Sequence, residues 1–263
     1  MTSGGAIQCW TLARSPAPWP VPTTVGVGIA SCVDDVAYAV TDDGRIFVWH
    51  SGWPGPPTPQ QLGTAAPVAA LTGRALRTTD GRAFDLECGV GGIGCTVGAA
   101  WPGVSDAEAI WTGDPQGGAL GAAPTVTDCV RHVGGVVDCR FAGRALTTLP
   151  PLLGIATPAA GTLVHVPVLD GALELVLEGA RLCARAAAGG VTCWGDPDRG
   201  RLGSNDTSVV HTTPVASGAE DLAMGRSLCA LRAGRVVCWG LTHSAWSSGA
   251  LCPPPLDRAL TIP

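Results

Sequence analysis

Two stretches of the sequence decide the fold: LCALRAGRVVCWG at residues 228–240 and LCARAAAGGVTCWGDPDRGRLG at residues 182–203. Each reads as an apolar strand, a short turn containing glycine, a second apolar strand and then Trp-Gly. Glycine supplies the positive φ that tight turns need, so both stretches predict β-hairpins. Weaker copies of this pattern occur at residues 37–50, 74–87 and 128–141, and a half copy occurs at residues 4–10.

The register of three hairpins places cysteines opposite one another. In residues 228–240, for example, a two-residue Ala233-Gly234 turn puts Cys229 opposite Cys238. Directly opposed residues are close enough for a disulfide, and the spacing is unlike the short C-x-x-C pairs of zinc sites. Disulfides are therefore favoured over buried free thiols or metal ligands. The predicted pairs are Cys129–Cys139, Cys183–Cys193 and Cys229–Cys238.

The remaining cysteines are less clearly assigned. Cys88 and Cys95 enclose a glycine-rich loop and are predicted to close it. Cys9 has no cysteine on its expected partner strand, and its alternative partners are Cys252 and Cys32, which leaves one thiol over. The chain has 11 Cys, so at least one has no partner within it. Cross-strand pairing indicates an extracellular or periplasmic location, although the opening MTSGGAIQCW has no signal-peptide pattern.

The hairpins recur as units of roughly 40 to 50 residues, which is the period of a β-propeller blade. We therefore expect an all-β propeller of six blades in a single domain, 1–263, with insertions around 88–127 and 142–180. A seventh blade at residues 107–118 is the alternative. Pairing of the N-terminal half copy with a strand in residues 253–263 would close the ring and remove open sheet edges. The positions equivalent to the Trp after the hairpin are Trp10, Trp49, Leu86, Arg140, Trp194 and Trp239.

Composition excludes several classes of protein. With Gly 37 and Pro 22 in 263 residues, most helices would be interrupted. The net charge is −5 and every basic residue is Arg, so we expect no nucleic-acid partner. The longest uncharged stretch, residues 145–169, contains four prolines, so we expect no membrane span. We also expect a monomer.

The motifs CALRAGRVVCWG and CWGDPDRGRLG resemble the regulator of chromosome condensation repeat. In that family a blade reads as an apolar strand, a glycine turn, Trp-Gly, an Asp-rich loop and Gly-x-Leu-Gly, which residues 200–203 match. Residues 66–68 and 213–215 resemble the family's Pro-Val step between blades. The cysteine-paired version looks like the bacterial branch, and the family is mostly seven-bladed. The resemblance implies a propeller; guanine-nucleotide exchange on a GTPase is a candidate function by this analogy alone.

Two motifs raise a cofactor or a metal and are better explained otherwise. Residues 89–94 fit G-x-G-x-x-G, but no helix follows to hold a pyrophosphate, so a loop between blades is favoured. Residues 196–200 carry alternating carboxylates, yet the further ligands of a calcium loop are missing. We therefore predict no cofactor and no metal. No catalytic residue is identified; an enzyme with its site in the axial funnel, drawing on residues 106–114, is the alternative to a binding module.

Polar and aromatic residues follow equivalent strands of three repeats. Exposed Trp beside Arg is typical of interface hot spots, so these residues predict a rim that binds a protein partner. Packing of the loop Trp residues onto their own blades is the competing interpretation. The predicted rim consists of His50, Trp53, Asp198, Arg199, Arg201, His243 and Trp246.

Overall fold

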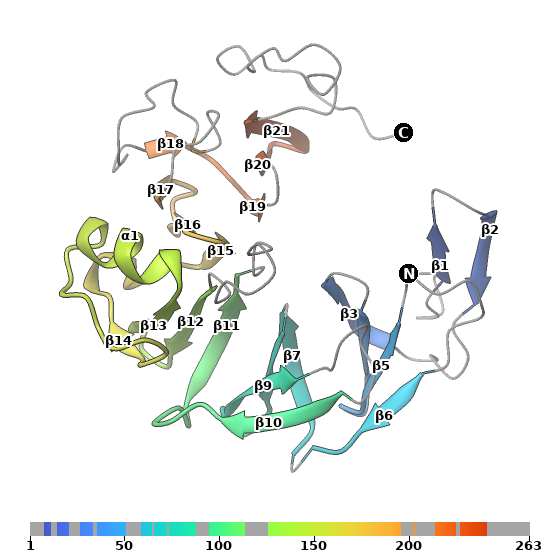
Figure 1. Cartoon of the computed structure of the whole chain (residues 1–263). Coiled ribbons are helices and arrows are strands. Elements are labelled where there is room, and N and C mark those ends of the chain that lie inside the picture. The colour runs from blue at the N-terminus through green and yellow to red at the C-terminus, as the bar shows by residue number, and fades with distance from the viewer. Residues whose placement is uncertain are drawn as a thin grey trace. The chain divides into compact units, whose positions relative to one another are not determined.

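The computed structural model describes residues 8–11, 15–20, 27–33, 36–50, 59–64, 66–72, 74–87, 95–113, 126–195, 202, 214–224 and 227–240. The chain divides into two compact units, residues 1–110 and 111–263, and each is described by itself. Within the described residues the strands form six small antiparallel sheets, drawn as separate groups of arrows in Figure 1.

The first unit contains a two-stranded sheet and two four-stranded sheets. Tyr38 and Ile46 from one four-stranded sheet pack with Leu76 and Leu86 from the next in one buried cluster. The sheets are β1 (Gln8–Thr11) with β2 (Ser15–Pro20); β3 (Val27–Val33), β4 (Val36–Thr41), β5 (Ile46–His50) and β6 (Gln60–Leu62); and β7 (Val68–Thr72), β8 (Ala75–Thr78), β9 (Ala83–Glu87) and β10 (Thr96–Ala100).

The second unit contains the other three sheets, and β11 crosses the boundary between the units. Two buried clusters lie between successive sheets of this unit. The sheets are β11 (Ala107–Thr112), β12 (Val126–His132), β13 (Val137–Ala142) and β14 (Val164–His165); β15 (Glu174–Glu178), β16 (Arg181–Arg185), β17 (Val191–Gly195) and β18 (Pro214–Ala216); and β19 (Asp221–Met224), β20 (Ser227–Arg232) and β21 (Arg235–Gly240).

The all-β prediction is confirmed, and the repeated positions fall on six different sheets. Trp10 lies on β1, Trp49 on β5, Leu86 on β9, Arg140 on β13, Trp194 on β17 and Trp239 on β21. Residues 107–112, part of the alternative seventh blade at residues 107–118, form the first strand of the fourth sheet. The predicted closure by the terminal strands lies outside the described residues.

A short helix is the main departure from the strand pattern. Helix α1 (Arg144–Leu152) and the 3-10 helix η2 (Pro167–Leu169) lie between β13 and β15. Helix α1 contains Pro150 and Pro151, which sequence reasoning treats as helix breakers. It persists because Ala145 and Leu149 are fully buried in the core of the second unit. Among the described helices none has the length and hydropathy needed to cross a membrane.

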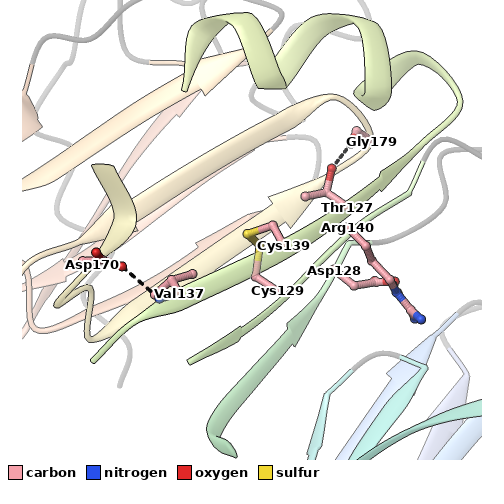
Figure 2. The surroundings of a disulfide bond; sticks show 8 residues. All are labelled: Thr127, Asp128, Cys129, Val137, Cys139, Arg140, Asp170 and Gly179. Atoms are coloured by element: carbon pink, nitrogen blue, oxygen red, sulfur yellow. Dashed lines mark hydrogen bonds and ion pairs between the residues drawn. A yellow bond between two sulfur atoms is a disulfide. The ribbon is translucent and has the colours of Figure 1, made fainter. Parts of the chain in front are cut away.

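The three predicted cross-strand disulfides are confirmed. Cys129–Cys139, Cys183–Cys193 and Cys229–Cys238 are paired in register and bonded, with Cα atoms 4.0 to 4.1 Å apart. Figure 2 shows the first of them between β12 and β13. Cys95 is also disulfide-bonded, but Cys88 lies outside the described residues, so that pairing stays a prediction. Three disulfides indicate a compartment that does not reduce them.

One backbone hydrogen bond repeats between successive sheets. The glycine that ends each hairpin turn accepts it through its carbonyl, and an N–H at or just before the first strand of the next sheet donates it. Each of these glycines has a positive φ, between 74° and 86°. The turn therefore fixes where the next sheet begins. The four pairs are Val68 N to Gly44 O at 3.0 Å, and Ala107 N to Gly81 O, Gly171 N to Gly135 O and Ala219 N to Gly189 O, each at 2.9 Å.

Candidate interaction surface

The structure places one residue of the predicted rim. His50 is the last residue of β5, which is the third strand of its sheet. The other rim segments follow β17 and β21 in the sequence, and these are also the third strands of their sheets. Trp53, Asp198, Arg199, Arg201, His243 and Trp246 lie outside the described residues. The rim therefore stays a prediction.

Four large apolar side chains in the second unit are exposed. Val133 is 65% exposed, Val168 52%, Leu173 46% and Val136 41%. Val133 and Val136 flank the glycines of the β12–β13 turn, while Val168 and Leu173 lie on the connection that leads to β15. We call Val133, Val136, Val168 and Leu173 the valine patch. Exposed apolar residues scattered singly need no explanation, but these four occupy two segments that are bonded to each other.

Four hydrogen bonds join the two segments of the valine patch. Besides Gly171 N to Gly135 O, the N–H of Val166 donates to the carbonyl of Val137 at 2.9 Å. The N–H of Val137 in turn donates to Asp170 Oδ1 at 3.0 Å, as Figure 2 shows. Arg131 Nη1 donates to the carbonyl of Ala172 at 2.9 Å. Because the backbone is already ordered, a partner would not need to order it on binding.

The valine patch is bordered by two histidine–aspartate pairs. His165 Nε2 lies 3.0 Å from Asp170 Oδ2, and His132 Nε2 lies 3.3 Å from Asp138 Oδ2. Asp138 and His165 are directly opposite in the β13–β14 register. The carboxylates of Asp138 and Asp170 therefore lie at this border, each beside an imidazole. The guanidinium of Arg131 lies over the Trp111 ring, 6.0 Å from its centre.

A second cluster of charged groups joins two successive sheets of the same unit. Arg185 Nε donates to Glu174 Oε2 at 2.8 Å, and the N–H of Leu222 donates to Asp221 Oδ1 at 2.9 Å. Burial raises the pKa of Glu174, and a hydrogen bond with the Asp221 carboxyl raises it further, against the opposing effect of Arg185. The carboxyl of Glu174 therefore holds its proton more readily than an isolated glutamic acid does.

The enzyme alternative draws on carboxyl groups in residues 106–114, of which the structure describes residues 106–113. Asp106 and Glu108 are exposed at β11, and Asp114 lies outside the described residues. In the described part of the chain, no three His, Cys, Asp or Glu side chains are grouped so that they could hold a metal ion.

Other charged pairs in this unit are structural. Arg181 Nη2 donates to Glu178 Oε2 at 2.7 Å, and both side chains are less than a tenth exposed. Arg140 binds Asp128 at 2.9 Å beside the Cys129–Cys139 bond (Figure 2).

The sequence did not predict the valine patch, because the two segments that form it are distant in the sequence. The one local signal was Val133 and Val136 beside a glycine turn, where an exposed polar residue is more usual.

No protein-family model matches this chain. No curated protein matches it either. Solved structures do resemble it: yeast RCC1 (Prp20), crystallised with Kap60, has a TM-score of 0.51 at 14% identity, over 89% of this chain and 60% of that one. Sqt1 from Saccharomyces cerevisiae has a TM-score of 0.50 at 12% identity, over 89% of this chain and 76% of that one.

Human WBSCR16 gives a TM-score of 0.48 at 16% identity, over 75% of this chain. The chain spans 55% of the length of WBSCR16 and 60% of the length of yeast RCC1. Identities this low carry the fold and leave the activity open. The six sheets and the likeness to yeast RCC1 and Sqt1 together give this chain a β-propeller fold.

Proposed function

We propose that this protein is a protein-binding module built on a disulfide-bonded β-propeller, acting in an extracellular or periplasmic compartment. The observation that carries the proposal is the valine patch, in which four exposed apolar side chains stand on hydrogen-bonded turns. Exposed apolar side chains that are bordered by polar groups are typical of protein interaction sites. A propeller of similar fold, yeast RCC1, has been crystallised with the protein Kap60, which supports the same kind of role here.

The cysteine pairing also supports the more specific assignment that the sequence favours. A secreted protein of the bacterial, cysteine-paired type would keep its cross-strand disulfides, and three are present. We further propose that residues 1–263 form a single monomeric propeller domain.

The experiment compares patch variants with a variant of an equivalent turn. Val133→Ser with Leu173→Ser makes the patch polar without adding charge. Ala187→Ser is the matched control, because Ala187 is exposed at the corresponding position of the β16–β17 turn. Proteins captured from the extracellular fraction of the source cells are compared by quantitative mass spectrometry. We expect a partner that the wild type and Ala187→Ser retain and the double variant loses; identical captures by all three would overturn the patch as the binding surface.

The predicted rim is proposed as a second contact and is tested separately. Trp53→Ala with Trp246→Ala removes its aromatic side chains, which interface hot spots typically use. Loss of a captured partner by this variant, with the valine patch intact, would support the rim. Unchanged capture would remove the rim from the proposal and leave the valine patch as the contact.

A further inference from the structure

We propose that the valine patch binds a protein segment in which an apolar side chain stands next to Lys or Arg. This inference rests on the proposed protein-binding function and specifies the chemistry of the partner. It follows from the charges that border the patch.

The carboxylate of Asp170 is available to a cation. Its side chain is 39% exposed, and its oxygens accept from the Val137 N–H and approach His165 Nε2. An ionised carboxylate has about four acceptor positions, so these contacts leave room for a guanidinium or an ammonium. The side chain of Asp138 is 29% exposed, pairs with His132 and lies opposite His165.

The guanidinium groups of Arg131 and Arg185 have partners of their own. Arg131 Nη1 is bonded to the carbonyl of Ala172, and its guanidinium lies over Trp111. On the Leu173 side, Arg185 is bonded to Glu174, whose carboxyl also meets Asp221. Carboxyl groups thus outnumber guanidinium groups at both ends of the patch. An apolar side chain with an adjacent cation is the complement of such a surface, whereas an acidic segment would be repelled.

The probe is a phage-displayed library of random peptides, selected on the full-length wild-type protein with its disulfides intact. Peptides that also bind Val133→Ser with Leu173→Ser are removed, so those that remain depend on the patch. We expect them to carry Leu, Ile, Phe or Trp close to Lys or Arg. Binding of a synthetic copy should weaken as salt is raised, because exposed charge pairs are screened.

Charge variants separate specific contacts from net charge. Asp138→Asn with Asp170→Asn should weaken binding of the synthetic peptide about five- to tenfold, since each exposed charge pair contributes only modestly to binding. The amide oxygen introduced by Asp170→Asn would still accept the Val137 N–H, so the turn should keep its shape. Asp42→Asn with Glu87→Gln removes the same charge from exposed positions in the first unit and should leave binding unchanged.

The outcomes distinguish failure of this inference from failure of the protein-binding function on which it rests. Patch-dependent peptides that are neutral or acidic would overturn the charge assignment and leave the protein-binding function standing. Equal weakening by both pairs of charge variants would also overturn it, because net charge alone would then explain the effect. If no selected peptide depends on the patch, both the inference and the role of the valine patch fail.

Discussion

The N–H of Ala219 donates a 2.9 Å hydrogen bond to the carbonyl oxygen of Gly189. This bond connects the β16–β17 turn with the segment that begins β19. A Cβ on Gly189 would lie 2.8 Å from the nitrogen of Ala219, and the φ of Gly189 is 74°. Glycine is therefore required at position 189 for two reasons: the turn needs a positive φ, and the next sheet approaches too closely for a Cβ.

Gly189→Ala should destabilise the protein by about 3 kcal/mol, because a left-handed backbone costs about 1 to 2 kcal/mol and overpacking adds about 1 to 3 kcal/mol. Gly234→Ala is the matched control: Gly234 has a φ of 71° but open space where the Cβ would be. It should lose about 1 to 2 kcal/mol. Urea unfolding midpoints of both variants test this, and equal losses would show that the contact with Ala219 is unimportant.

Reduction should reach the Cys229–Cys238 bond first. Both of its cysteines are half-buried, whereas Cys183 and Cys193 are fully buried in the core. A thiolate must contact a disulfide sulfur to reduce it, so access controls the rate when the protein stays folded. Timed treatment with a mild reductant, followed by alkylation and mass spectrometry, gives the order. Simultaneous opening of both bonds would mean that global unfolding, rather than local exposure, controls reduction.

Glu174→Gln should change how stability depends on pH. The pKa of Glu174 is raised above its usual 4.5 by burial and by Asp221. The folded state therefore binds this proton more tightly than the unfolded state does, and the resulting stability is present below about pH 4.5 and lost as pH rises through the raised pKa. The free energy of unfolding of wild type minus that of Glu174→Gln should therefore decrease as pH rises through the raised pKa of Glu174.

Chemical unfolding at a series of pH values measures this difference. Asp221→Asn provides a control, because it removes the neighbouring acid that contributes to the rise in pKa. Its own pH dependence should be shallower than that of wild type. A difference between wild type and Glu174→Gln that stays constant or grows with pH would contradict the prediction.

Asp80→Asn should change the pH dependence of stability in the opposite direction to Glu174→Gln. Hydrogen bonds from Arg82 and then Thr78 lower the pKa of Asp80 to about 2, from a usual 3.8. The stability that this carboxylate contributes is present above about pH 4 and is lost as pH falls through about 2. Wild type and Asp80→Asn should therefore converge in acid, as measured by urea unfolding.

The chain supplies a second copy of this site as a check. Asp43 is held in the same way by Thr41 and Arg45, and its pKa is also lowered. Asp43→Asn should converge with wild type in acid in the same direction. If either variant diverges from wild type as pH falls, the Thr-Asp-Arg turn does not hold its carboxylate in the charged form.

The hairpins and their disulfides could be derived from the sequence because they are local. Cys183 and Cys193 are ten residues apart, and the length of one glycine turn decides that they face each other. Strand alternation and turn chemistry act over that distance without help from the rest of the fold. The same reasoning located two neighbouring strands in five of the six sheets and one strand, β1, in the other.

The remaining strands were set by tertiary structure. β14 has two residues and β10 is mostly exposed, so neither has an apolar alternation to detect. Helix α1 forms in spite of two prolines because Leu149 packs into the hydrophobic core.

The sequence by itself determined the hairpins, their register and the three cysteine pairs, since each depends on neighbours along the chain. Only the tertiary structure decided which sheets meet and which side chains gather on a surface. Val133 and Val168 belong to one patch because Gly171 bonds to Gly135, and Glu174 meets Asp221 because β15 lies beside β19. Such contacts join residues far apart in the sequence, and no local propensity specifies them.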